Sequence, residues 1–179
     1  MTKTLYLLRH TKAEESVPGS TAKDHARALA PRGKRAAKTM SGHFATQILS
    51  VDRVYCSASK RTRETFDAVR EGLKNPAVSF RDALYLSPSE ELIAFVQALP
   101  DTLHSAMIIG HNPGLHDVAL MLISRAGRGQ AKALEKLRTK FPTGAFCALS
   151  FDVASWKKVG AGLATLTTFV RPRDLDHAD

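Results

Sequence analysis

The sequence TLYLLRH, residues 4–10, is a short apolar run that ends in an arginine and a histidine. An apolar run of this length, followed at once by polar residues, is typical of a buried strand. VDRVYC, residues 51–56, and AMII, residues 106–109, have the same character. Helical patterns lie between the three runs, so the sequence predicts βαβ units and a largely parallel sheet.

The remaining segments continue this alternation of helices and strands. We expect helices over Pro31–Ile48, over Ser59–Leu73, from Ser87 to Leu99, from Pro113 through Ile123, and over Gln130–Arg138. Further strands are expected over Val78–Arg81, Ala145–Phe151 and Leu163–Val170, the last two as a hairpin at an edge of the sheet. Glu14–His25 is polar, and Pro18-Gly19 marks it as a loop.

The predicted architecture is α/β, with one domain over residues 1–179. We expect three layers: a mostly parallel central sheet covered by helices on both faces. Two helix starts carry capping signals. Ser87 and Glu90 have the spacing of a capping box, and Asn112 is the predicted N-cap of the helix that begins at Pro113.

Composition narrows the classes of protein that the chain can represent. No apolar run approaches the roughly 18 residues of a membrane span, and Arg9-His10 interrupts a start too short for a signal peptide. We therefore expect a cytoplasmic protein without a membrane partner, and a monomer. Cys56 and Cys147 are expected to be buried thiols, since two distant cysteines form neither a zinc site nor a redox motif.

The net charge of +9 and the isoelectric point near 9.8 point to an anionic partner. Basic residues are spread along the chain and are dense only in Lys23–Lys38 and Arg125–Lys140. Most of them are expected on solvated helix surfaces. Nucleic acid is disfavoured as a partner because the chain lacks a basic strand rich in aromatic residues that would stack on bases.

Polar side chains follow three of the predicted strands at the point where each strand ends. These are Arg9-His10, the segment from Ser57 to Arg61, and His111. Each cluster alone also has an ordinary structural explanation: a hydrogen-bonded structural histidine, a surface arginine, or a turn between a strand and a helix. Ligands of parallel sheets bind beyond the carboxyl ends of the strands, so we expect all three clusters at one rim.

Two histidines and two arginines in one cavity suit phosphoryl transfer. A neutral imidazole is a good nucleophile near neutral pH and forms a phosphoramidate intermediate. Guanidinium groups match phosphoryl oxygens in pairs and stay charged. Catalysis of this kind consists mainly of positioning and electrostatic stabilisation, so these side chains could supply it without a metal.

At these positions the sequence resembles the histidine phosphatase superfamily, also called phosphoglycerate mutase-like. The resemblance is carried, in order, by LYLLRHTKAE (5–14), CSASKRTRETF (56–66) and IIGHNPGL (108–115). The small size and the GHNPGL form are similar to the SixA-type phosphohistidine phosphatases within it. The resemblance implies that Arg9 and Arg61 bind phosphate, that His10 is the nucleophile and that His111 is the second catalytic histidine. It also implies no cofactor.

The sequence departs from the family pattern at several positions. Thr11 follows His10 where Gly or Ala is usual, and Glu64 replaces the usual Gln. We include Thr11 and Asn112 as candidates for phosphate contacts. Arg61 fits the family register better than Arg63, although the two are close in sequence.

The acidic residue that larger members use to protonate an alcohol leaving group has no clear counterpart. Asp82, Glu90 and Glu91 are the candidates, and Glu90 and Glu91 are also explained as helix N-terminal carboxylates. Without a lid insertion, the site suits a bulky substrate. Imidazole also leaves more readily than an alkoxide once it is protonated.

These observations support three functions. The first is dephosphorylation of phosphohistidine on a signalling or phosphotransfer protein. The second is hydrolysis of a small phosphate ester by a broad-specificity phosphomonoesterase. The third is a binding module for a phosphoprotein or nucleic acid, which would not need a nucleophile and is therefore the least favoured.

Overall fold

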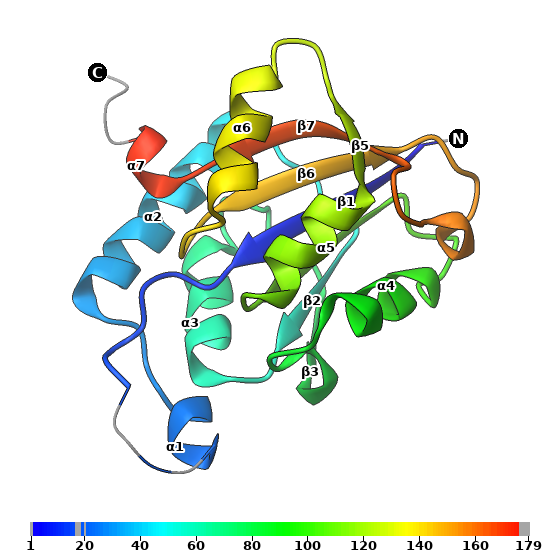
Figure 1. The fold of residues 1–179 in the computed structure, drawn as a ribbon. Coiled ribbons are helices and arrows are strands. Elements are labelled where there is room, and N and C mark those ends of the chain that lie inside the picture. Colours follow the sequence, from blue (N-terminus) through cyan, green and yellow to red (C-terminus); the bar gives the residue numbers. More distant parts are fainter. Residues whose placement is uncertain (1, 17–18, 20, 176–179) are drawn as a thin grey trace.

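A central sheet dominates the computed structural model, which describes residues 2–16, 19 and 21–175 (Figure 1). Within this part of the chain, seven strands pair in the order β3-β2-β4-β1-β6-β7-β5. Their bounds are β1 Lys3–Arg9, β2 Arg53–Ser57, β3 Val78–Arg81, β4 Ser105–Gly110, β5 Ile123–Ala126, β6 Phe146–Phe151 and β7 Ala164–Val170.

The sheet is mostly parallel, as predicted. Strands β3, β2, β4 and β1 run parallel to one another, and β5 runs parallel to β7. Only β6 runs in the opposite direction, between β1 and β7. The βαβ order of the first half of the chain requires this parallel pairing, because each crossover helix returns the chain to the same edge.

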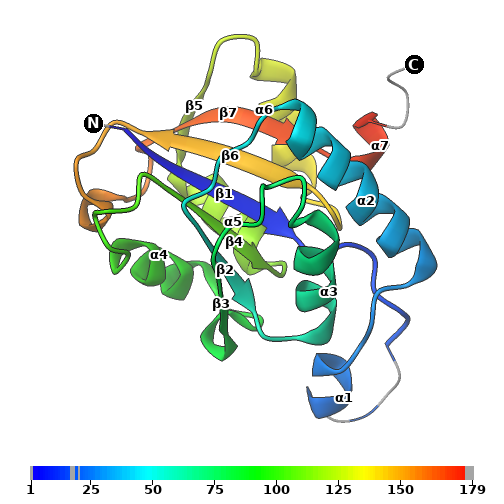
Figure 2. The ribbon, with the colours of Figure 1, turned by 180° about the vertical axis from the view of Figure 1, so that it is seen from behind.

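Helices cover both faces of the sheet and give the three-layer α/β/α fold (Figures 1 and 2). Helices α2 (Pro31–Thr46) and α3 (Lys60–Val69) pack on one face through Met40, Phe44 and Phe66. On the other face lie α4 (Ser89–Gln97), α5 (Gly114–Leu122) and α6 (Ala131–Thr139). Short helices complete the described chain: α1 Thr21–His25, α7 Pro172–Leu175 and the 3-10 turns Asp82–Leu84 and Trp156–Lys158. No helix of the described residues combines the length and apolarity needed to cross a bilayer.

Three sequence predictions of elements were wrong. The β6–β7 pair is not at the sheet edge, because β5 adds outside β7. Ile123 continued the apolar stripe of the preceding helix, but its backbone leaves the helix after Leu122 and pairs with Ala164. Helix α1 lies inside Glu14–His25, which was expected to be a loop. Pro18, the other marker of that loop, lies outside the described residues.

The predicted caps also differ from the structure. Helix α5 begins at Gly114, and the Asn112 side chain donates to the carbonyl of Phe141 at 2.8 Å instead of capping the helix. The Ser87 hydroxyl donates to Glu91, at 3.1 Å, and not to Glu90. In both cases the side chain bonds to a partner other than the backbone N–H groups that a cap requires.

Cys56 and Cys147 are buried and unpaired, as expected. Burial raises the pKa of the Cys56 thiol to about 12 and raises that of Cys147 as well. Both therefore stay protonated and behave as small apolar side chains.

Gly33 lets the first turn of α2 approach the segment that follows β1. A Cβ at this position would lie 2.0 Å from the carbonyl oxygen of Lys12. The same carbonyl accepts the N–H of Ala30 at 3.0 Å. This contact fixes the chain directly after His10 against the start of the helix.

Gly33→Ala is expected to lower the free energy of unfolding by about 1–3 kcal/mol, because backbone must move to admit the methyl group. Gly42→Ala, on the same helix, is the matched control: its Cβ would meet no atom within 4 Å. That change should raise stability by about 0.5–1 kcal/mol through helix propensity alone. Urea unfolding of both variants measures the difference, and equal stabilities would contradict the close approach.

Candidate active site

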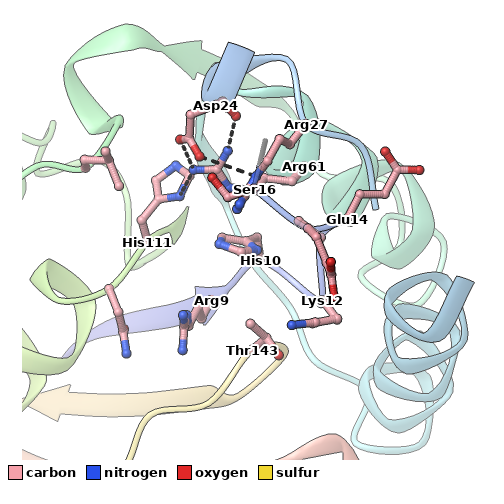
Figure 3. A pocket seen from close by; sticks show the side chains of 14 residues that line it. Arg9, His10, Lys12, Glu14, Ser16, Asp24, Arg27, Arg61, His111 and Thr143 are labelled. Carbon is pink, nitrogen blue, oxygen red and sulfur yellow. Dashed lines mark hydrogen bonds and ion pairs between the residues drawn. The ribbon is translucent and has the colours of Figure 1, made fainter. Parts of the chain in front are cut away.

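The carboxyl ends of β1, β2 and β4 lie level with one another. Arg9 pairs with Gly110, and Leu8 and Cys56 both pair with Ile109. The residues that follow these strand ends therefore leave the sheet at one edge, as the sequence predicted. A cavity of about 530 Å³ opens there, and its lining includes Arg9, His10, Arg61 and His111 (Figure 3).

His10 is buried, with 6% of its surface exposed, and its ring has a defined orientation. Its Nδ1 lies 2.7 Å from the carbonyl oxygen of Thr11. A carbonyl only accepts hydrogen bonds, so Nδ1 carries the proton and Nε2 carries the lone pair. The centre of the ring is 5.2 Å from that of His111.

Burial lowers the pKa of His10 to about 3, and the nearby charges of Arg61 and Arg9 act in the same direction. The hydrogen bond to Thr11 opposes this shift without cancelling it. The imidazole is therefore neutral at neutral pH, and its Nε2 lone pair is free to act as a nucleophile.

Arg61 enters the cavity from the first turn of α3 and is almost completely buried. Its Nη1 donates to the carbonyl of Asp24 at 2.7 Å, and its Nη2 donates to the carboxylate of Asp24 at 3.1 Å. Arg63 is exposed and lies over the ring of Phe80, with its guanidinium carbon 4.0 Å from the ring centre. Of the two arginines left open by the sequence, only Arg61 lines this cavity.

His111 lies between Ser57 and Arg61. Its Nδ1 is 3.4 Å from Nη2 of Arg61, which can only donate, and its Nε2 is 2.8 Å from the hydroxyl of Ser57. The proton of His111 is therefore on Nε2. Burial, followed by the proximity of His10 and Arg61, lowers the pKa of His111 to about 2, so this ring is also neutral.

Arg9 lines the wall of the cavity next to Asn112. Its Nη1 donates to the carbonyl of Phe141 at 2.9 Å, the same oxygen that Asn112 contacts. Burial and the charge of Arg61 lower the pKa of Arg9. The Nε groups of Arg9 and Arg61 are buried and have no hydrogen-bond acceptor within the described part of the chain. Such groups cost about 1–3 kcal/mol each until an acceptor reaches them.

Asp24, on α1, is a site residue that the sequence reasoning missed. Its carboxylate accepts hydrogen bonds from Arg61 and from the Tyr85 hydroxyl, and it lies 3.4 Å from Nε of Arg27. The bond from Tyr85 and then the charges of Arg61 and Arg27 lower its pKa, so it stays ionised. The i, i+3 spacing of Asp24 and Arg27 is typical of an ion pair on a helix and was the available signal. It lies in a stretch without apolar periodicity, which would otherwise have indicated the helix.

Other predicted residues lie elsewhere. Thr11 is fully buried and does not line the cavity, and its hydroxyl lies 3.5 Å from that of Thr65. Asp82, Glu90 and Glu91, the candidate acids, are exposed and do not line the cavity either. The carboxylates that do line it are Glu14, Glu15 and Asp24. Lys12 and Arg27 are further charged lining residues that the sequence reasoning did not select.

Nowhere in residues 2–16, 19 and 21–175 do three or more His, Cys, Asp or Glu side chains gather as a metal site would require. The chemistry of the cavity is that of guanidinium and imidazole groups around a space for an anion.

Comparison with known proteins identifies the family. The family model for the histidine phosphatase superfamily (branch 1) matches residues 5–85. An uncharacterized protein of Mycobacterium leprae is 31% identical over 168 residues, covering 93% of this chain and 100% of that protein. The chain belongs to the histidine phosphatase superfamily.

Solved structures agree with this membership. A protein from Nakamurella multipartitia assigned as the phosphohistidine phosphatase SixA aligns with a TM-score of 0.78 and 29% identity, over 96% of this chain and 97% of that one. A SixA protein from Agrobacterium tumefaciens with the same assignment aligns with a TM-score of 0.77 and 25% identity, over 95% and 98% of the two chains. The resemblance to SixA-type members of the histidine phosphatase superfamily is thus confirmed.

The neutral state of His10 can be tested by NMR. Between about pH 8 and pH 5, the ring resonances of His10 should not titrate, because its folded-state pKa of about 3 lies below this window. Samples free of phosphate are required, since an anion in the cavity would raise the pKa. A midpoint near the ordinary histidine value would contradict the burial argument.

Proposed function

We propose that this member of the histidine phosphatase superfamily dephosphorylates phosphohistidine on a protein, through a phosphohistidine intermediate at His10. Superfamily membership and the SixA neighbours support phosphatase activity. The observation that carries the proposal is the lone pair on Nε2 of buried, neutral His10, in a cavity lined by the guanidinium groups of Arg9, Arg27 and Arg61.

The first half-reaction transfers the phosphoryl group to the enzyme. Nε2 of His10 attacks the phosphorus atom, the N–P bond of the substrate breaks, and the departing imidazole keeps the bonding electrons and takes up a proton. His10 then carries a phosphoryl group on Nε2 and a proton on Nδ1, so its ring becomes cationic. The Thr11 carbonyl at 2.7 Å stabilises that charge.

The second half-reaction restores the enzyme. Water attacks the phosphorus atom, the bond to Nε2 breaks, and inorganic phosphate leaves with His10 neutral again. Arg9 and Arg61 bind the phosphoryl oxygens in both steps, because their Nε groups require acceptors. Asp24 and Tyr85 hold Arg61 in place, and His111 completes the opposite wall.

The walls of the cavity support the proposed substrate class. Only residues 82–88 connect β3 to α4, which leaves no room there for an inserted lid. Asp24 stays ionised and therefore does not protonate a leaving group. An open cavity supports a protein substrate, and imidazole leaves more readily than an alkoxide, so it needs less help from an acid.

Replacing His10 tests the nucleophile. His10→Ala should lower turnover of a phosphohistidine peptide by at least about 10³-fold and abolish the acid-labile phosphoenzyme seen after rapid quenching with denaturant. Arg63→Gln is the control, since Arg63 is exposed outside the cavity, and it should keep both properties. Turnover that is retained in the His10→Ala variant would contradict the proposed role of His10 as the nucleophile.

A phosphomonoesterase is the second candidate, because Glu14 and Glu15 line the cavity and carboxyl groups are the usual general acids for an alcohol leaving group. We expect kcat/KM to be at least about tenfold higher for a phosphohistidine peptide than for any member of a monoester panel. The double change Glu14→Gln and Glu15→Gln should leave peptide turnover within about twofold. A preference for monoesters that these changes remove would establish the second candidate instead.

A further inference from the structure

A second cavity, of about 270 Å³, adjoins the active-site cavity. Lys12 and Thr143 line both, so the two cavities share a wall. In Figure 3 these residues lie together on the side of His10 that faces away from Asp24. We name the second cavity the basic cleft, after its charged lining residues Lys12, Arg32, Lys140, Arg171 and Arg173.

Among the described residues, little negative charge compensates the cations of the basic cleft. Asp174 pairs with Arg171, at 2.6 Å from Nη2 and 2.9 Å from Nε, and so neutralises that cation. Within the described ranges, no carboxylate lines the cleft or forms an ion pair with its other four cations. Like charges gathered around a concave surface raise the local potential and concentrate anions there.

Backbone contacts fix the walls of the cleft. The N–H of Gly144 donates to the carbonyls of Arg9 and His10, both at 3.1 Å. Gly144 has a φ of +77°, and a Cβ there would approach Pro172 to 2.7 Å. These contacts hold the loop before β6 and the segment after β7 against the end of β1. The cleft and the nucleophile are thus parts of one rigid unit.

The nature of the cations indicates the occupant. Arg32, Lys140 and Arg173 are exposed, and they come from three separate elements or loops of the fold. Long, hydrated side chains spread in this way suit carboxylates on a surface segment that stays partly in water. A cleft of about 270 Å³ takes in a few side chains, not a folded domain. The net charge of +9 attracts an acidic partner over a longer range.

We propose that the basic cleft binds acidic side chains that flank the phosphohistidine of the protein substrate. The proposal rests on the proposed function, which supplies the phosphorylated segment. With the phosphoryl group at His10, the chain of the substrate continues past Lys12 and Thr143 into the cleft. Acidic flanking residues then lower KM, while the chemical step at His10 is unchanged.

Two synthetic peptides test the proposal. Both carry one central phosphohistidine, with Glu and Asp on both sides in one peptide and Gln and Asn at the same positions in the other. For the unaltered protein, kcat/KM for the acidic peptide should be roughly tenfold higher, through KM, as expected for a few exposed ion pairs. Free phosphohistidine serves as the substrate that cannot reach the cleft.

The cleft variant combines Arg32→Gln, Lys140→Gln and Arg173→Gln. The control variant, Arg128→Gln, Lys157→Gln and Lys158→Gln, removes the same charge from exposed positions outside both cavities. The cleft variant should turn over both peptides equally, and the control should keep the preference. Both should hydrolyse free phosphohistidine like the unaltered protein.

Each other outcome counts against the proposal. Peptide turnover without an acidic preference, or a preference that persists in the cleft variant, would overturn the role of the cleft and leave the proposed function intact. Salt-dependent binding of a single-stranded oligonucleotide that only the cleft variant loses, with equal peptide turnover, would assign the cleft to nucleic acid. Hydrolysis of monoesters but of no phosphohistidine compound would overturn both proposals.

Discussion

Strands β1 and β4 run parallel, and their pairing ends with Arg9 opposite Gly110. This register decides which side chains meet. His10 and His111 each follow directly, so their rings come to 5.2 Å although about a hundred residues separate them. Pairing of β2 with β4 then brings Ser57 and the start of α3 to the same level, and with them Arg61. A slip of one residue would turn these side chains to the opposite face of the sheet.

Burial has different effects on the charge of the imidazole groups and of the guanidinium groups in the site. Removal from water lowers the pKa of His10 and His111 far enough to keep both rings neutral, whereas guanidinium remains charged even where its pKa falls. Burial therefore produces two neutral imidazole rings among cations. The carboxylate of Asp24 offsets part of that charge at Arg61, and the buried Nε groups of Arg9 and Arg61 still require an acceptor.

The sequence was sufficient to predict the parallel sheet and the meeting of Arg9, His10, Arg61 and His111, because strand ends are marked by abrupt changes from apolar to polar residues. It was not sufficient for Asp24, since the helix of Thr21–His25 has no buried residue and hence no apolar period. The sequence pattern did not predict strand β5, because Ile123 fits both the apolar stripe of a helix and a strand. The direction of the Thr11 side chain depends on Thr65, a contact that no local pattern encodes.

The close approach at Gly33 has a consequence for how partners are selected. Lys12 is held against α2 by backbone contacts, so the main chain fixes the position of His10 relative to the first turn of α2, where Arg32 lies. This fixed distance between His10 and one wall of the basic cleft sets the spacing that a bound segment has to match. Under the proposed role of the basic cleft, substrates of identical composition would differ in KM when the number of residues between their phosphohistidine and their acidic residues differs.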